Sequence, residues 1–297
     1  CSSSGDNPTD HSGLSECLLR ACQFRYESGA VAGDRPIRME KLSLKCFGIG
    51  DGWPSARNHS AFLYRIDSTA LLLDCGEPVS RSFHQSGVGC DALDSIILSH
   101  LHFDHAGGFF MLIQGLWLKH RTKPLPVYLP RDGVVPMRQM LDAGCIFDEL
   151  LPFRLQFQPL RAREPIQIGN ISVTPFLTTH LESFRRRFQS SYAQDFAAFC
   201  FLMQTEALRV GHSADIGTPE DLTPLLNQPV DLLVCELAHV SPEELFAFLN
   251  GRQISRLILV HLTEKQLQHV DELRALAASR LGNIQVTFAA DGDEIAF

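Results

Sequence analysis

The strongest constraint on this chain comes from seven consecutive residues, Ser99–His105, which read Ser-His-Leu-His-Phe-Asp-His. Three imidazoles and one carboxylate stand within six residues, directly after the apolar segment Ser95–Leu98. Four such side chains cannot all be core residues, because each would need a polar partner there. Neutral imidazole and carboxylate are ligands that suit zinc, manganese or iron. The segment therefore predicts a metal site at the end of a strand.

The spacing within this segment favours two metal positions. In an extended chain alternate side chains share a face, so His100 and His102 are expected to point toward one ion. A turn into a helix that begins after Ala106 would swing Asp104 and His105 toward another position. Two ions roughly 3.5 to 4 Å apart can hold both the attacking and the leaving oxygen of a displacement.

The composition excludes several classes of protein. The 297 residues include 45% hydrophobic and 20% charged side chains, a balance typical of a folded globular protein. The longest apolar runs fall far short of the roughly 18 to 20 residues that a membrane span needs, so no span is predicted. The formal charge is −8, from 26 Lys and Arg against 34 Asp and Glu. This balance argues against wholesale nucleic-acid binding and leaves only a local basic patch open.

The nine cysteines indicate a reducing compartment. Their number is odd, and no two of them form a C-x-x-C pair. Cys46, Cys75, Cys200 and Cys235 stand inside apolar segments, where a free thiol behaves as a small hydrophobe. A cytoplasmic protein is therefore predicted. A minor alternative is a bacterial lipoprotein, because Cys1 followed by Ser and Gly resembles its processed end.

Two regions differ along the chain. Residues 1–38 are rich in Ser, Gly and Asp, and we expect a poorly structured N-terminal extension there and a compact domain over residues 39–297. The predicted strands are Met39–Phe47, Ala61–Ile66, Leu71–Asp74, Ser95–Ser99, Val127–Leu129, Ile171–Phe176, Ala197–Leu202, Leu208–Val210, Leu232–Val234, Leu257–Val260 and Ile284–Phe288. Helices are expected after Ala106, after Pro219, from Pro242, and over Lys265–Leu281. This pattern favours helices layered outside large sheets.

The His-rich segment resembles the signature of the metallo-β-lactamase superfamily. The resemblance implies the α/β (α+β) class and a four-layer αββα sandwich that binds one or two metals at the ends of its sheets. The superfamily places a third His, a bridging Asp and a last His after later strands. His180, Asp215 and His261 each follow a predicted strand in that order, so the resemblance covers essentially the whole domain.

The resemblance implies a full set of metal ligands and two divalent ions. Zinc is the first choice of metal, with manganese and iron as alternatives. In this assignment Asp215 bridges the ions, His100, His102 and His180 hold the first, and Asp104, His105 and His261 hold the second. A hydroxide between the ions would be the nucleophile, and Asp104 would orient it.

The opening of the domain indicates the branch of the superfamily. Phe47–Pro54, Arg57-Asn58 and Leu72–Glu77 resemble the opening of ribonuclease Z and related phosphodiesterases. Asp74 is expected to be a supporting or turn-forming carboxylate. A bridging Asp215 argues against a true β-lactamase. The resemblance therefore implies a dinuclear metal-dependent hydrolase, a phosphodiesterase resembling ribonuclease Z.

The chain departs from ribonuclease Z in two places. That family has a His-Glu pair after the strand that follows the bridging Asp, and its His is thought to protonate the leaving group. Here Cys235-Glu236 stands at this position, and His239 lies three residues beyond Glu236, where it either serves instead or only leads a helix. The long Gly- and Pro-rich arm that grips tRNA is also not found, which favours smaller phosphodiesters.

The segment Leu181–Tyr192 resembles a substrate-binding element. Arg185, Arg186, Arg187 and Tyr192 follow a predicted metal ligand and could hold an anionic phosphate and stack a base. The alternative is a solvated, charged loop. The predicted partner is a small anionic substrate or a short nucleotide.

Other functions of the same fold stay open. The stretch His102–Gly108 also resembles lactonases, which keeps a lactone, ester or β-lactam hydrolase as an alternative. A second alternative is an iron-dependent oxidoreductase, which metal analysis would separate. Family members often dimerise, so a homodimer stays open too. The remaining histidines, interpreted as structural or surface residues, are His11, His59, His84, His120, His212 and His269.

Overall fold

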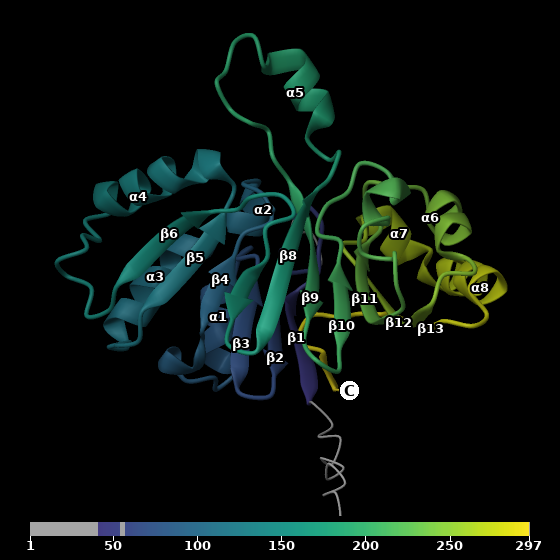
Figure 1. Cartoon of the computed structure of the whole chain (residues 1–297), viewed down its shortest axis with the longest axis horizontal. Coiled ribbons are helices and arrows are strands. Elements are labelled where there is room, and N and C mark those ends of the chain that lie inside the picture. The colour runs from purple at the N-terminus through teal and green to yellow at the C-terminus, as the bar shows by residue number, and fades with distance from the viewer. Residues whose placement is uncertain (1–40, 54–56, 297) are drawn as a thin grey trace, which may run out of the picture. The chain divides into compact units, whose positions relative to one another are not determined.

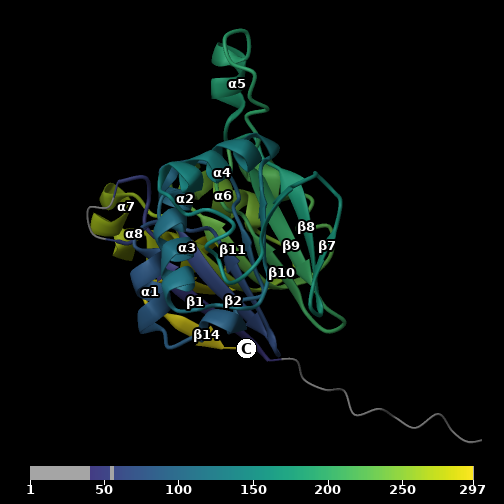
Figure 2. The same ribbon diagram turned by 90° about the vertical axis from the view of Figure 1, so that its left-hand side faces the viewer.

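Two seven-stranded β-sheets lie face to face in the computed structural model of the chain (Figure 1 and Figure 2). The structure describes residues 41–53 and 57–296. The predicted extension, residues 1–38, therefore lies outside the described residues. The same holds for the first two residues of the predicted domain and for residues 54–56 of the opening motif.

Parallel pairing brings several strand ends to one edge of each sheet. The first sheet consists of β1 (Leu42–Gly48), β2 (Ala61–Ile66), β3 (Thr69–Leu73), β4 (Ser95–Ile97), β5 (Leu125–Leu129), β6 (Leu155–Pro159) and β14 (Glu294–Ala296). The second consists of β7 (Ile166–Ile168), β8 (Ile171–Leu177), β9 (Phe199–Gln204), β10 (Arg209–His212), β11 (Val230–Glu236), β12 (Ile254–Val260) and β13 (Gln285–Phe288). The strand orders are β14-β1-β2-β3-β4-β5-β6 and β13-β12-β11-β10-β9-β8-β7. Because β3 to β6 run parallel, and β10 to β13 do too, their carboxyl ends meet at common edges.

Both sheets are buried on two faces, which explains their nearly continuous apolar sequences. Successive side chains of a strand point to opposite faces. In β3, Leu72 packs against helices while Leu71 packs against the other sheet. In β12, Leu257 packs against helices while Ile258 faces the first sheet. The fold is therefore the predicted αββα sandwich.

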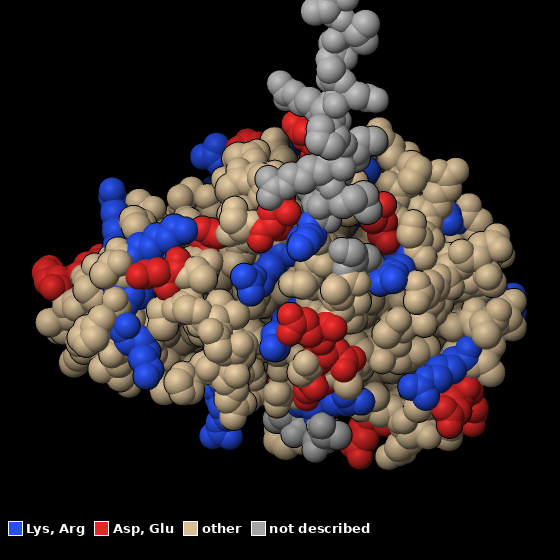
Figure 3. All heavy atoms as spheres, turned by 90° about the horizontal axis from the view of Figure 1, so that it is seen from below, with Lys and Arg blue, Asp and Glu red and all other residues tan. Residues whose placement is uncertain are grey.

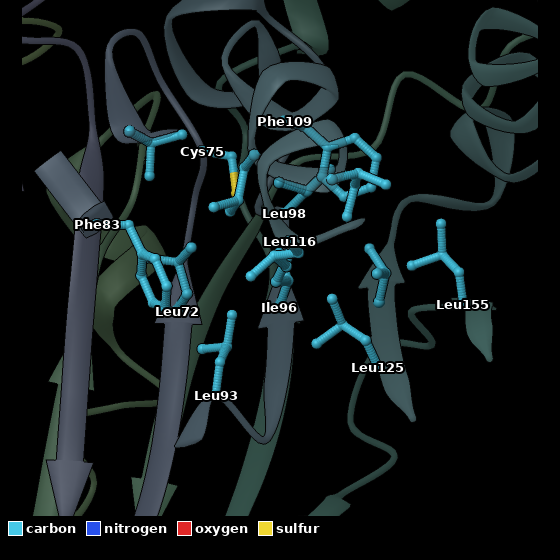
Figure 4. Close-up of a cluster of buried hydrophobic side chains, with 14 of the residues drawn as sticks. Leu72, Cys75, Phe83, Leu93, Ile96, Leu98, Phe109, Leu116, Leu125 and Leu155 are labelled. Carbon is cyan, nitrogen blue, oxygen red and sulfur yellow. The ribbon is translucent and has the colours of Figure 1, made fainter. Parts of the chain in front are cut away.

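Helices cover the outer face of each sheet. Those over the first sheet are α1 (Val79–Gln85), α2 (Phe103–Ala106), α3 (Phe109–Leu118) and α4 (Val134–Ala143), and those over the second are α6 (Pro242–Leu249), α7 (Glu264–Gln268) and α8 (Val270–Arg280). Short 3-10 helices are η1 (Cys90–Ala92), η2 (Arg131–Gly133) and η3 (Pro219–Leu222). Figure 4 shows the first of these layers, where Phe83, Phe109 and Leu116 pack on Leu72 and Ile96. One further helix, α5 (Glu182–Phe188), projects away from the sandwich (Figure 1 and Figure 2).

Some elements differ from those the sequence predicts. The helix expected after Ala106 is α3, which begins at Phe109, and a further short helix that was not expected, α2, begins at Phe103. Its first turn forms because the N–H groups of His105 and Ala106 both donate to the carbonyl oxygen of His102, at 3.0 Å. The helix predicted over Lys265–Leu281 is two helices, α7 and α8. Strands β6, β7 and β14 were not predicted, because short strands at sheet edges bury too few apolar side chains to show a pattern.

The described residues bear on three expectations from composition, which concern membrane spans, surface charge and the cysteines. Within residues 41–53 and 57–296, no helix is long and apolar enough to cross a membrane. On the face opposite α5, basic and acidic side chains are interspersed where they are visible (Figure 3). The described cysteines, all of them free thiols, are Cys46, Cys75, Cys90, Cys145, Cys200 and Cys235.

A fully buried arginine joins two loops beneath the first helical layer. The guanidinium of Arg121 donates to the carbonyl oxygens of Lys123 at 2.7 Å, Leu93 at 2.8 Å and Pro124 at 2.9 Å, and also to that of Cys90. The side chain has no exposed surface. These bonds fix the loop before β4 against the loop before β5.

Replacing Arg121 by methionine is expected to lower the free energy of unfolding by about 3 to 5 kcal/mol. Several carbonyl oxygens would lose their donor at roughly 1 kcal/mol or more each. Denaturant unfolding would measure the loss. The matched control is Arg131→Met, because this arginine is 76% exposed and its removal should change stability little. Equal stability of the Arg121→Met variant and the parent protein would contradict the assigned role.

Candidate metal centre

The seven predicted ligands come from five segments that meet at one end of the two sheets. These are His100 and His102 after β4, Asp104 and His105 in α2, His180 after β8, Asp215 after β10, and His261 after β12. A carboxylate ties two of these segments together. Asp221 Oδ2 accepts from the N–H of Thr179 and the N–H of Gly217, both at 2.9 Å, and so links the loop of His180 to the loop of Asp215.

The ligand atoms form two groups with Asp215 between them. One group is His100, His102 and His180, and the other is Asp104, His105, Asp215 and His261. Asp215 Oδ2 lies 3.7 Å from His100 Nε2 and 3.6 Å from His180 Nε2. Asp215 Oδ1 lies 3.2 Å from His105 Nε2 and 3.7 Å from His261 Nε2. The two carboxylate oxygens therefore face the two groups separately, as a bridging ligand requires.

The spacing of the ligand atoms suits a small divalent ion. His102 Nδ1 and His180 Nε2 are 3.3 Å apart. Two nitrogens bound to one tetrahedral zinc at about 2.0 to 2.1 Å are separated by roughly the same distance. The first group therefore already has the separation that a shared ion would impose.

Buried atoms without partners point to the same conclusion. His100 Nε2, His105 Nε2 and Asp215 Oδ1 are buried and have no hydrogen-bond partner in the part of the chain that the structure describes. Buried polar atoms are nearly always paired, because leaving them unpaired is costly. All three atoms belong to the converging groups, so a cation there would satisfy them. The residues present thus fit a dinuclear metal centre.

Side chains behind the site leave the other imidazole nitrogens free for metal. The outer partners are Ser99 Oγ for His100 Nδ1 at 3.1 Å, Asp74 Oδ2 for His105 Nδ1 at 2.7 Å, and Ser60 Oγ for His261 Nδ1 at 3.1 Å. Asp74 is fully buried and also accepts from the N–H of Ser99 at 2.7 Å. Such partners orient ligands and fix the imidazole tautomer. Asp74 therefore supports the site and does not belong to either ligand group.

Burial lowers the pKa of two of the imidazoles in the first group. It lowers the pKa of His100 well below its usual range and that of His180 to about 4. Imidazoles with such pKa values are neutral at pH 7, which is the form that binds metal. For Asp215 burial acts in the opposite direction, but His105 and His261 hold its pKa well below its usual range. The carboxylate is therefore ionised.

Three backbone positions at the site are strained. Asp74, Ala214 and His261 have positive φ angles of 61°, 44° and 53°. Residues with a Cβ rarely adopt this region, and strain of this kind concentrates at functional sites. The conformation at Ala214 directly precedes Asp215, so it helps to aim the bridging carboxylate.

Glu236 and His239 lie together beside the ligands. The Nδ1 atom of His239 is 3.1 Å from Glu236 Oε1 and 3.7 Å from Asp215 Oδ2, and the His239 ring centre is 4.6 Å from that of His180. Glu236 is buried and accepts from the N–H of Ile216. Burial opposes it, but the hydrogen bond and the charge of Glu236 raise the pKa of His239 to about 9. His239 is thus a half-exposed side chain at the edge of the centre, with a raised pKa that favours its protonated form.

The arginine-rich segment forms a helix, α5, and not a loop. Among the described residues, two of its arginines form ion pairs with a glutamate of the same helix. Arg185 and Arg186 both pair with Glu182, at 2.7 and 2.9 Å. Arg187 stacks on Phe188, with 5.0 Å between its guanidinium carbon and the ring centre. Phe184 of the same helix lies over the site, with its ring centre 6.0 Å from that of His102.

His59 is a buried histidine that belongs to neither ligand group. It was interpreted as a structural or surface residue, and it is only 8% exposed. Within the described part of the chain, both of its ring nitrogens are buried without a hydrogen-bond partner. His212 does fit the structural interpretation, because its Nδ1 lies 2.7 Å from the hydroxyl oxygen of Tyr64 between the sheets.

A four-layer αββα sandwich with this His/Asp cluster at the sheet ends defines a member of the metallo-β-lactamase superfamily. The structure of YhfI from Bacillus subtilis, a metallo-β-lactamase fold protein, matches with a TM-score of 0.67 and 20% identity over 87% of this chain and 100% of that chain. Human tRNase Z, short form, matches with a TM-score of 0.65 and 19% identity over 85% and 98%. Within the superfamily, the chain belongs to the family described as Anti-Pycsar protein Apyc1, which matches residues 42–279.

Curated relatives support the ribonuclease Z-like branch. Ribonuclease Z from Bradyrhizobium diazoefficiens is 26% identical over 228 residues, which cover 75% of this chain and 70% of that protein. Other ribonuclease Z proteins match over only 33 to 47% of their own length. The predicted superfamily and branch are therefore confirmed.

Proposed function

We propose that this chain is a dinuclear metal-dependent phosphodiesterase. The proposal rests above all on the position of Asp215, because its two carboxylate oxygens face two separate groups of metal-type ligands. When bound, two divalent ions supply an activated nucleophile at neutral pH and stabilise the charge that develops on the phosphoryl oxygens. Zinc is the proposed metal, since imidazole nitrogen and carboxylate oxygen suit it.

The residues of the chain have separate roles in this proposal. Asp104 presents Oδ2 toward His105 and His261 and can orient the attacking water there. His239 holds a proton at the edge of the site and can donate it to the leaving oxygen. Glu236 accepts from the backbone N–H of His239 at 3.0 Å, so it positions this donor.

The proposed substrate is a small anionic phosphodiester or a short nucleotide. The ribonuclease Z relatives are named for action on RNA, and the metallo-β-lactamase fold neighbours include a diphosphatase of the PhnP family. The family of this chain is described as Anti-Pycsar protein Apyc1. We therefore propose an anti-Pycsar role for this chain, and we propose that its hydrolytic site performs this role. The cytoplasmic location and the homodimer stay predictions.

The decisive experiment combines metal analysis of the purified chain with three hydrolysis assays. We expect two zinc or manganese ions per chain and turnover of bis-p-nitrophenyl phosphate. Turnover of only a lactone or a β-lactam would keep the site and reject the phosphodiesterase. Iron together with oxygen consumption would replace the hydrolase by the oxidoreductase alternative.

Arg185, Arg186 and Arg187 of α5, and Tyr192 just beyond its end, are proposed to contact the substrate. Arg186 is 77% exposed and pairs only through its Nε with Glu182, so its other nitrogens stay available for phosphate. Arg186→Ala should raise KM for an anionic diester several-fold with little change in kcat, as measured by steady-state kinetics. The control is Arg161→Ala, an exposed arginine paired with Glu164. If both variants leave KM unchanged, the α5 arginines are only a solvated helix.

A further inference from the structure

In the second group of ligands, some side chains have a hydrogen-bond partner on the side away from the proposed metal and one does not. His105 and His261 each have an outer partner, Asp74 and Ser60. Asp104 contacts the ligand atoms of His105 and His261 through Oδ2, at 3.5 and 3.9 Å, but its carboxylate has no hydrogen bond to another group in the described part of the chain. Carboxylates that bind metal are normally held by a further hydrogen bond. Asp104 therefore lacks the support that its neighbours have.

The side chain of His59 also lacks hydrogen bonds to other described residues, although it is buried. This side chain is more than nine-tenths buried, and neither ring nitrogen has a hydrogen-bond partner among residues 41–53 and 57–296. A buried polar group without a partner destabilises a fold, because it loses its hydrogen bonds to water and gains none in return. An apolar side chain of similar size would fill this position without that cost. The imidazole therefore has a use that stability does not explain.

The chain places these two residues on either side of one glycine. A Cβ added at Gly76 would lie 2.2 Å from the carbonyl oxygen of Asp104 and 2.5 Å from the Cβ of His59. Only a residue without a side chain lets the segment of His59 approach α2 so closely. The charged and titratable groups that face His59 are Asp104, Glu77, His105 and His261, with Asp104 the strongest of them.

The imidazole of His59 can contact Asp104 through a water molecule. A neutral imidazole offers one donor and one acceptor. Among the described residues, no hydrogen bond or ion pair joins His59 to Asp104 directly. One water can bridge two polar groups that are too far apart for a direct bond, at little cost in free energy.

We propose that His59 is a positioning residue of the second metal position, which holds the carboxylate of Asp104 through one bridging water. The inference rests on the proposed metal centre. With this contact, each of the three side chains is held by a different residue. Asp74 holds His105, Ser60 holds His261, and His59 holds Asp104. His59 then acts through Asp104 and does not itself touch the reacting atoms.

The test compares His59→Leu with His59→Gln, since glutamine keeps one donor and one acceptor. Affinity for the second zinc ion would be measured by competition with a chelator, and Tm would be measured on the metal-free protein. For His59→Leu we expect about 10- to 100-fold weaker binding of the second ion. Its metal-free Tm should be equal or higher, because the unpaired imidazole is gone. His59→Gln should keep most of the affinity.

A matched control separates this role from simple packing. His212→Leu also removes a buried imidazole, but it leaves the Tyr64 hydroxyl without its partner, so its metal-free Tm should fall. Unchanged zinc affinity in His59→Leu, while the parent chain binds two ions and hydrolyses the diester, would overturn this inference alone. A metal-free Tm that falls equally in the Leu and Gln variants would overturn it as well, since that indicates a structural role. A parent chain that binds no second ion would overturn both this inference and the proposed function.

Discussion

Asp215→Ala is expected to abolish hydrolysis of a phosphodiester and to release at least one metal ion per chain. Its two oxygens serve both ligand groups, so the substitution removes a ligand from each position at once. The loss in kcat/KM should exceed the roughly 10²- to 10³-fold effect of deleting one electrostatic contact to a transition state. Steady-state kinetics and elemental analysis of the same preparation would measure both losses.

Two comparisons make the Asp215 result specific. Asp215→Asn keeps one oxygen and should retain one ion better than the second, whereas Asp215→Ala should weaken both. Asp271→Ala, at a carboxylate that is 90% exposed, should leave turnover and metal content unchanged. Normal metal content in the alanine variant would show that Asp215 is not the bridge.

The predicted ligand set rests on the resemblance of the His-rich segment to a known signature, together with the positions of His180, Asp215 and His261 after apolar strands. Parallel strands of one sheet end at the same edge, so residues such as Asp215 and His261 meet there although 46 positions separate them in the sequence. The His-x-His-x-Asp-His segment needs only local geometry to bring its members together. The additional helix α2 does not change the two groups, because its single turn carries Asp104 and His105 to one side.

Among the supporting residues, Asp74 could be predicted from its place in the opening motif, and it does bond to His105. The others could not be predicted, because their roles depend on neighbours far away in the sequence. Ser60 lies 201 positions before His261, to which it bonds, and nothing near Ser60 indicates that contact. The ring nitrogens of His59 have no hydrogen-bond partner among the described residues, so a pattern of residues cannot separate it from a core histidine. Backbone strain at Ala214 is equally invisible, since alanine gives no sign of a positive φ.

His239→Ala is expected to slow the hydrolysis of a diester with an alkoxide leaving group by about 10²- to 10⁴-fold, the usual contribution of a general acid. An alkoxide must receive a proton as it departs, and His239 holds one beside the ligands through its contact with Glu236. The p-nitrophenolate ion leaves without a proton, so bis-p-nitrophenyl phosphate should lose far less. The ratio of kcat/KM between the two substrates is the measurement.

The pH dependence gives a second readout of the same proton. Burial would lower the pKa of His239, but Glu236 raises it to about 9, so the donor is charged below that pH and is lost as the pH rises through it. The parent chain should therefore slow on the alkaline side with the alkoxide substrate, and His239→Ala should lack that limb. An equal slowing of both substrates, together with lost metal, would instead make His239 a ligand, as its nearness to His180 and Asp215 allows. Because the leaving-group ratio and the metal content change independently, the two roles cannot be confused.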